Sequence, residues 1–129
     1  MHVKEWKRIA EQEALRYREH KAFIKGAEDG GGAVSERYRQ SVRWVLAVDY
    51  VLEHLHRTDA EKERFFRLCY GIDGTRRRLD QKGMVALSFA LNASTTTLYR
   101  WRREAVSLLL IAAAQTGALR PYRIEPTPQ

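Results

Sequence analysis

The pattern of apolar and polar positions predicts a series of amphipathic helices and therefore an all-α fold. The clearest stripe lies within residues 34–56, where apolar side chains recur every three or four positions, at Val34, Tyr38, Val42, Val45, Val48, Leu52 and Leu55. Because an α-helix turns once in about 3.6 residues, these side chains share one face of a core helix. Residues 3–28 are rich in helix formers but carry a weaker stripe, which lapses around Glu13 and His20. We expect one long N-terminal helix within residues 1–29, which lies on the domain surface or pairs with a second copy as a homodimer.

Turn residues divide the rest of the chain. Three consecutive glycines favour no regular structure, so residues 30–33 are predicted to form a joint. Thr58 and Glu61 match the capping-box pattern, which starts a helix. These signals and the stripes predict a helical core over residues 34–117, with helices at 34–56, 59–70, 80–91 and 94–116. The three prolines in the last ten residues predict an extended tail over residues 118–129.

The stretch 83–103, GMVALSFALNASTTTLYRWRR, predicts two helices joined by a tight turn. The first is apolar on most faces, with Met84, Val85, Leu87, Phe89 and Leu91. Asn92 stands at the turn, because asparagine tolerates the left-handed backbone conformation, and Ser94 is a favourable N-cap for the second helix. Leu98, Trp101 and Ala105 would dock that helix on the core. This order is typical of a helix-turn-helix, whose second helix reads the major groove of DNA.

The distribution of charge points to the same stretch. The chain has a formal net charge of +7, and residues 76–103 hold seven Lys and Arg against a single Asp, whereas the segments on either side are nearly balanced. Such an excess indicates a polyanionic partner, either nucleic acid or an anionic membrane surface. Because the excess coincides with the helix-turn-helix pattern, double-stranded DNA is the expected partner.

Residue type and helical phase assign roles at such an interface. Ser94 and the threonines after it are small polar residues that let the helix start approach phosphates and base edges. By phase, the residues expected in the major groove are Thr95, Thr96, Tyr99, Arg100 and Arg103. Arg100 is the best candidate for a bidentate contact to guanine, and Arg102, nearer the flank, is expected on phosphate. The neighbouring backbone would be held by Arg76, Arg77, Arg78 and Lys82. The structural alternatives are that Tyr99 covers an apolar edge and that the threonines only cap the helix.

Other chemistry is not indicated. The chain shows no paired-carboxylate or Ser/His/Asp constellation and no Cys/His metal spacing, so we expect neither an enzyme nor a cofactor. Cys69, the single cysteine, rules out an internal disulfide and stands among apolar residues, as a buried structural thiol would. The N-terminus, MHVKEWKRIAEQE, is charged throughout, and no apolar run approaches the roughly 20 residues that a bilayer requires. A cytoplasmic protein that does not enter the membrane is expected.

Residues 65–105 resemble sigma factor region 4-like domains, and more closely the phage-encoded late-gene transcriptional regulators of the RinA/ArpU type. The resemblance rests on a tyrosine–glycine turn before the helix-turn-helix and on a closing S-x-x-T-x-Y-R-W-R signature. The matching positions here are Tyr70, Gly74, Leu87, Leu91, Ser94, Thr97, Tyr99, Arg100, Trp101 and Arg102. Two departures are Asn92, where the family commonly has glycine, and a few extra residues within 75–82. The resemblance implies a phage or prophage regulator that binds promoter DNA and contacts RNA polymerase.

Two other functions fit the same residues. One is a DNA-packaging adaptor similar to a small terminase subunit, which would form a ring-shaped oligomer. The other is a helical interaction module that binds RNA polymerase or a sigma factor without touching DNA.

Overall fold

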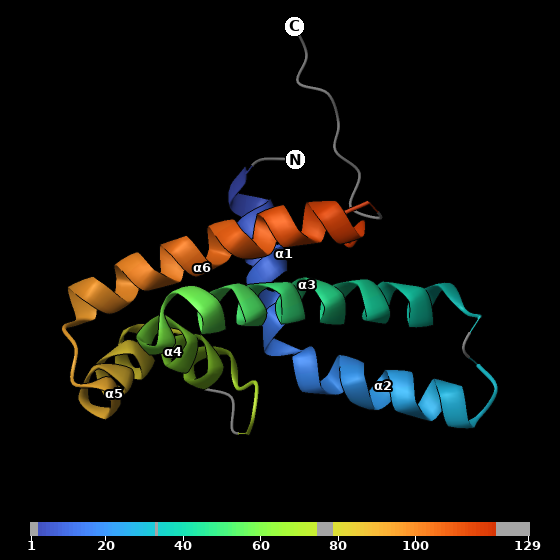
Figure 1. The fold of residues 1–129 in the computed structure, drawn as a ribbon, viewed down its shortest axis with the longest axis horizontal. Coiled ribbons are helices and arrows are strands. Elements are labelled where there is room, and N and C mark those ends of the chain that lie inside the picture. The colour runs from blue at the N-terminus through green and yellow to red at the C-terminus, as the bar shows by residue number, and fades with distance from the viewer. Residues whose placement is uncertain (1–2, 33, 75–78, 121–129) are drawn as a thin grey trace, which may run out of the picture.

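The computed structural model describes residues 3–32, 34–74 and 79–120, which form six helices and no strand (Figure 1). In chain order these are α1 (Val3–Leu15), α2 (Tyr17–Asp29), α3 (Glu36–Thr58), α4 (Ala60–Tyr70), α5 (Gln81–Leu91) and α6 (Thr95–Thr116). The predicted all-α class is confirmed.

Helix α3 is the axis of the fold. It lies between α6 on one side and α2 on the other, and it runs antiparallel to both (Figure 1). Its buried side chains are Ser41, Trp44, Ala47, Val48, Val51, Leu52 and Leu55. The hydroxyl of Ser35 caps its start by accepting the backbone N–H of Tyr38 at 3.1 Å. Val34, the first residue of the predicted stripe, is therefore outside the helix and 78% exposed.

The single N-terminal helix predicted over residues 1–29 is wrong, because the chain breaks at Arg16 into α1 and α2 (Figure 1). Arg16 has φ −96° and ψ 12° and ends the regular run. Beyond it, α2 lies along α3, to which the hydroxyl of Tyr17 donates a hydrogen bond at Asp49. Before it, α1 buries Ile9 and Ala10 and packs across α6. One straight helix could not follow both partners, so the break lets each half bury its own apolar face. The apolar face expected to lie on the surface or to pair with a second copy packs instead against α6 and α3 of the same chain.

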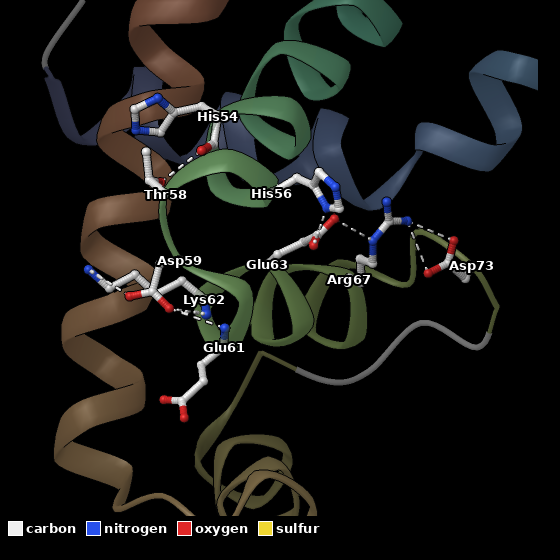
Figure 2. A network of polar contacts seen from close by, with 9 residues as sticks. All are labelled: His54, His56, Thr58, Asp59, Glu61, Lys62, Glu63, Arg67 and Asp73. Carbon is white, nitrogen blue, oxygen red and sulfur yellow. Dashed lines mark hydrogen bonds and ion pairs between the residues drawn. The ribbon is translucent and has the colours of Figure 1, made fainter.

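The start of α4 also differs from the prediction. The N-cap is Asp59 and not Thr58, because the Asp59 carboxylate accepts the backbone N–H groups of Glu61 and Lys62, both at 3.1 Å (Figure 2). Thr58 is the last residue of α3, and its hydroxyl donates to the carbonyl oxygen of His54 at 2.7 Å. An aspartate fills the capping role as well as a threonine does, so the pattern located the helix start only to within one residue.

One end of the molecule is a compact unit of α4, α5 and the first turns of α6 (Figure 1). Its fully buried side chains are Phe65, Phe66, Cys69, Tyr70, Met84, Leu87 and Leu98. Trp101 packs edge-on against Phe65, with ring centroids 6.0 Å apart. The docking face predicted for the second helix is therefore present, with Leu98 and Ala105 buried and Trp101 partly buried.

Helix α5 is less enclosed than its sequence indicates. Met84 and Leu87 face the core, but Val85 is 39% exposed and Phe89 is 83% exposed. Helix α5 therefore carries apolar residues on most of its faces, as predicted, but the fold buries only one of them.

The packed chain continues further than the predicted core. Gly117 ends α6 in the left-handed conformation, with φ 80°. Ala118 and Leu119 are then buried, and the side-chain amide of Gln40 donates to the carbonyl oxygen of Ala118 at 2.6 Å. The tail therefore does not begin at residue 118, and the rest of it, residues 121–129, lies outside the described residues.

Leu87 and Phe89 stand two positions apart on α5 and offer a matched test of this orientation. Leu87→Ala removes fully buried methyl groups and leaves a cavity, so the free energy of unfolding should fall by about 2–5 kcal/mol. Phe89→Ala removes an exposed ring and should change it by less than about 0.5 kcal/mol. Urea denaturation followed by circular dichroism measures both, and equal losses would contradict the orientation of α5.

Cys69 provides a test of core closure. Its side chain is fully buried, and burial raises the pKa of the thiol to about 12. Since the thiolate is the reactive form, the folded protein should label with a thiol reagent at about pH 8 on the order of a hundredfold more slowly than the urea-unfolded chain. Rapid labelling without urea would show that this part of the core opens readily.

Candidate nucleic-acid interface

The predicted helix-turn-helix stretch forms two helices, α5 and α6, joined by a short turn at residues 92–94. Asn92 adopts the predicted left-handed conformation, with φ 51° and ψ 46°. The backbone N–H of Ala93 closes the turn on the carbonyl oxygen of Ser88 at 3.1 Å. The hydroxyl of Ser94 accepts the backbone N–H of Thr97 at 3.1 Å and donates to the Thr97 hydroxyl at 2.9 Å. Ser94 is thus engaged as the N-cap, the structural role predicted for it.

The two sides of α6 differ sharply over its first turns. Leu98 and Ala105 point into the core, whereas Thr96, Arg100 and Arg103 are exposed on the opposite side. Thr95 and Tyr99, at the edges of that side, are partly buried. The structure therefore brings together most residues predicted for the major groove.

Two further charged residues of these helices are exposed. Glu104 is also exposed, but its carboxylate is 2.7 Å from the ammonium group of Lys62 on α4, which offsets its charge. Lys82 is exposed in the first turn of α5. Arg76, Arg77 and Arg78, predicted on the backbone of the neighbouring strand, lie outside the described residues.

Arg102 lies in a different environment from the one predicted. Its guanidinium binds the carboxylate of Glu11 on α1 in a bidentate manner, Nε to Oε2 at 2.8 Å and Nη2 to Oε1 at 2.9 Å. Its Nη1 donates to the carbonyl oxygen of Leu79 at 3.1 Å. The hydrogen bonds to Glu11 raise the pKa of Arg102. All three guanidinium nitrogens have a partner within the chain, so this residue is placed as a structural link between helices.

The same carboxylate receives a third donor from α4. The hydroxyl of Tyr70 donates to Oε2 of Glu11 at 2.6 Å, and burial, with Glu11 nearby, raises the pKa of Tyr70 well above its usual value. Glu11 therefore joins α1, α4 and α6 at one point.

This junction brings basic residues of α1 beside α6. Lys4, Lys7 and Arg8 are exposed and line one cleft together with Arg102 of α6. Lys7 also lines a second cleft, together with Arg102 and Arg103. These three residues are not predicted from the charge distribution, because the N-terminal segment is nearly neutral in total. Their spacing along one helical face is visible in the sequence, but their proximity to α6 is a tertiary effect.

A Ser–His–Glu arrangement is present that the sequence did not suggest. His20 lies between Ser41, with Nδ1 to Oγ at 2.9 Å, and Glu13, with Nε2 to Oε2 at 2.5 Å. His20 and Ser41 are only 6% and 4% exposed, so a substrate would not reach the serine hydroxyl in this conformation. The three residues link the α1–α2 break to α3 and explain why the apolar stripe lapses there.

Of the two histidines near the end of α3, His54 and His56, the second is paired with a carboxylate of α4. His56 and Glu63 are joined at 3.0 Å, and Glu63 and Asp73 both bind Arg67 (Figure 2). The hydrogen bond from His56 lowers the pKa of Glu63. Over the three described stretches of the chain, no cluster of three His, Cys, Asp or Glu could hold a metal ion. None of the helices described here is long and apolar enough to span a bilayer.

The Glu11–Arg102 pair can be measured by a double-mutant cycle. Glu11→Gln and Arg102→Gln should each lower the free energy of unfolding by about 1–3 kcal/mol, because each leaves a partly buried charge without its partner. The double variant should lose less than the two single losses together, with a coupling energy of about 1–3 kcal/mol. The control Arg103→Gln changes an exposed neighbour, so its free energy of unfolding should stay within about 0.5 kcal/mol of the wild-type value. Additive losses in urea denaturation would show that the pair is not coupled.

Comparisons of the chain with protein-family models, with curated proteins and with solved structures find no match. The function therefore has to be inferred from the positions of this chain's own residues. The feature that indicates a function most specifically is the outward face of α6, formed by Thr96, Arg100 and Arg103.

Proposed function

We propose that this protein is a sequence-specific DNA-binding transcriptional regulator that reads the major groove with the first half of α6. The observation that carries this proposal is the two-sided character of that half-helix. Leu98 and Ala105 anchor it in the core, while Thr96, Arg100 and Arg103 stand exposed on the other side. A helix held in this way can enter a groove without rearrangement of the fold.

The chemistry of the exposed side suits duplex DNA. The threonines are short, so they allow the N-terminal end of the helix, with its unpaired N–H groups and positive dipole, to approach a phosphate. Arg100 is placed to reach a base edge, where a guanidinium can bind O6 and N7 of guanine together. Arg103 and Lys82 are exposed cations that would contact the phosphate backbone and set the position of the protein on the duplex.

A regulatory role, in a phage or prophage, is supported by the resemblance of residues 65–105 to RinA/ArpU-type regulators. Contact with RNA polymerase belongs to the same proposal. The exposed ring of Phe89 on α5, beside the turn into α6, is the kind of surface that a protein partner would cover.

The competing functions make different predictions in solution. A packaging adaptor would form a ring-shaped oligomer, which a mass measurement in solution would reveal. An interaction module without DNA binding would not be retained on heparin or duplex DNA at moderate salt. The proposed regulator should be retained, with an affinity that falls steeply as salt is added.

Selection of binding sites from random duplex DNA tests the proposal. The wild-type protein should recover a defined motif. Arg100→Ala should lose preference at one base pair and bind the wild-type motif about 10- to 100-fold more weakly, because one bidentate base contact is worth about 1–3 kcal/mol.

The matched control is Arg39→Ala. Arg39 is an exposed arginine near the start of α3, at the opposite end of that helix from α4 and α5 (Figure 1). Its variant should select the same motif with unchanged affinity. If Arg100→Ala also leaves both motif and affinity unaltered, α6 does not read DNA through this face.

A further inference from the structure

We infer that the cleft between α1 and α6 binds successive phosphates of one DNA strand through Lys4 and Lys7 of α1 together with Arg103 of α6. The inference rests on the proposed DNA-binding function and extends it to a helix outside the helix-turn-helix. It assigns α1 the task of holding the strand beside the groove that α6 enters.

The cleft consists of two hollows that share residues. One, of about 200 Å³, is lined by Lys7, Glu11, Tyr99, Arg102, Arg103 and Val106. The other, of about 550 Å³, lies further along α1 and adds Lys4 and Arg8. Because Lys7, Glu11 and Arg102 line both, the two hollows are neighbours along the crossing of α1 and α6. We call the two hollows together the α1–α6 cleft.

The charge within the α1–α6 cleft is suited to an anion. Glu11 is the carboxylate that lines it, and both of its oxygens are bound by Arg102. That pair compensates itself, so the surplus charge comes from Lys4, Lys7 and Arg103, which are all exposed. Arg8 adds a further cation, whose Nη1 donates to the side-chain oxygen of Gln12 at 3.3 Å. The result is a basic groove whose floor is held rigid by an internal ion pair.

The acidic residues of α1 do not oppose this charge. Lys4, Lys7, Arg8 and Glu11 are spaced three and four apart and share one face of the helix. Glu5 points about 100° away from Lys4 and about 160° away from Lys7, and its nearest cation on α1 is Arg8, three positions later. Glu13 is turned inward, to His20. Lys4 and Lys7 therefore face the cleft without a free carboxylate between them.

The position of the α1–α6 cleft favours a backbone phosphate over a free one. Tyr99 and Arg103 line it and also stand at the edge of the α6 face proposed for the major groove. Helix α1 crosses α6 on the C-terminal side of the first turns of α6, so these first turns extend beyond the crossing (Figure 1). A strand that borders the groove would leave the exposed side of α6 at Arg103 and meet Lys7 and Lys4 in turn. The phenolic hydroxyl of Tyr99 could donate a hydrogen bond to the phosphate nearest Arg103.

The salt dependence of binding to the selected duplex tests this assignment in the full-length protein. The double variant Lys4→Ala/Lys7→Ala should reduce the slope of log affinity against log salt by about two, since each lost phosphate contact removes about 0.9. At about 0.1 M salt its affinity should fall about tenfold or more, and its selected motif should stay the same. The control Lys25→Ala/Arg39→Ala removes the same charge from exposed positions on α2 and α3 and should retain more of the wild-type slope.

The outcomes separate the two proposals. If the wild-type protein binds DNA but the two double variants have equal slopes, the role of α1 is overturned and the α6 assignment stands. If the α1 variant loses slope while Arg100→Ala changes nothing, the α1 contact is supported and the α6 reading is overturned. If the wild-type protein does not bind DNA, both proposals are overturned.

A mapping experiment checks the position of α1 on the duplex. Lys7→Cys can carry a thiol-linked iron chelate that cleaves nearby DNA, because the one native thiol, at Cys69, is buried. Cleavage should be confined to the backbone at one flank of the motif, and cleavage that is absent or evenly spread would overturn the inference. Inorganic phosphate at constant ionic strength should not displace DNA more than chloride does. Displacement from the wild-type protein that disappears in the Lys4→Ala/Lys7→Ala variant would instead identify a free-phosphate site.

Discussion

The carboxylate of Glu11 holds three helices in register. It accepts both arms of the Arg102 guanidinium from α6 and the hydroxyl of Tyr70 from α4. The side chains of Glu11 and Arg102 are 14% and 24% exposed, so the junction is only partly accessible to water. Low polarity strengthens each of these bonds and makes the loss of any partner expensive. This carboxylate, together with the packing of α6 against α3, sets the angle at which α6 leaves the core and therefore the direction of its exposed face.

Three arginines within four positions of α6 have different environments for that reason. Helical phase turns Arg100 and Arg103 to the outside, whereas Arg102 faces α1 and is neutralised there. The signature that the sequence presents as one basic run is therefore divided between a structural ion pair and a proposed ligand surface. A substitution at Arg102 that weakened DNA binding would act first through the position of α6, so binding data for it require a parallel measurement of stability.

The elements that depend on local chemistry could be predicted from the sequence. The N-caps Ser35 and Ser94 and the left-handed turn at Asn92 follow from side-chain and backbone preferences within a few residues, and the structure has them. The break at Arg16 could not be predicted, because both halves of residues 3–28 are good helix formers and only their separate docking partners divide them. The environment of Arg102 and the cations of α1 were missed for the same reason, since Glu11 and Arg102 are 91 positions apart.

Helix α6 is one uninterrupted rod of 22 residues, and this has a consequence for any partner of the protein. Its first turns form the proposed reading head, while its later turns are packed against α3, with no hinge between them (Figure 1). Once the first turns of α6 occupy the major groove, the rest of the protein therefore lies on one defined side of the duplex. Moving the site by half a turn of DNA, about five base pairs, would carry the body to the opposite side of the duplex. Whether the protein contacts a second protein bound nearby would therefore depend on the rotational position of the two sites around the DNA helix more than on the distance between them.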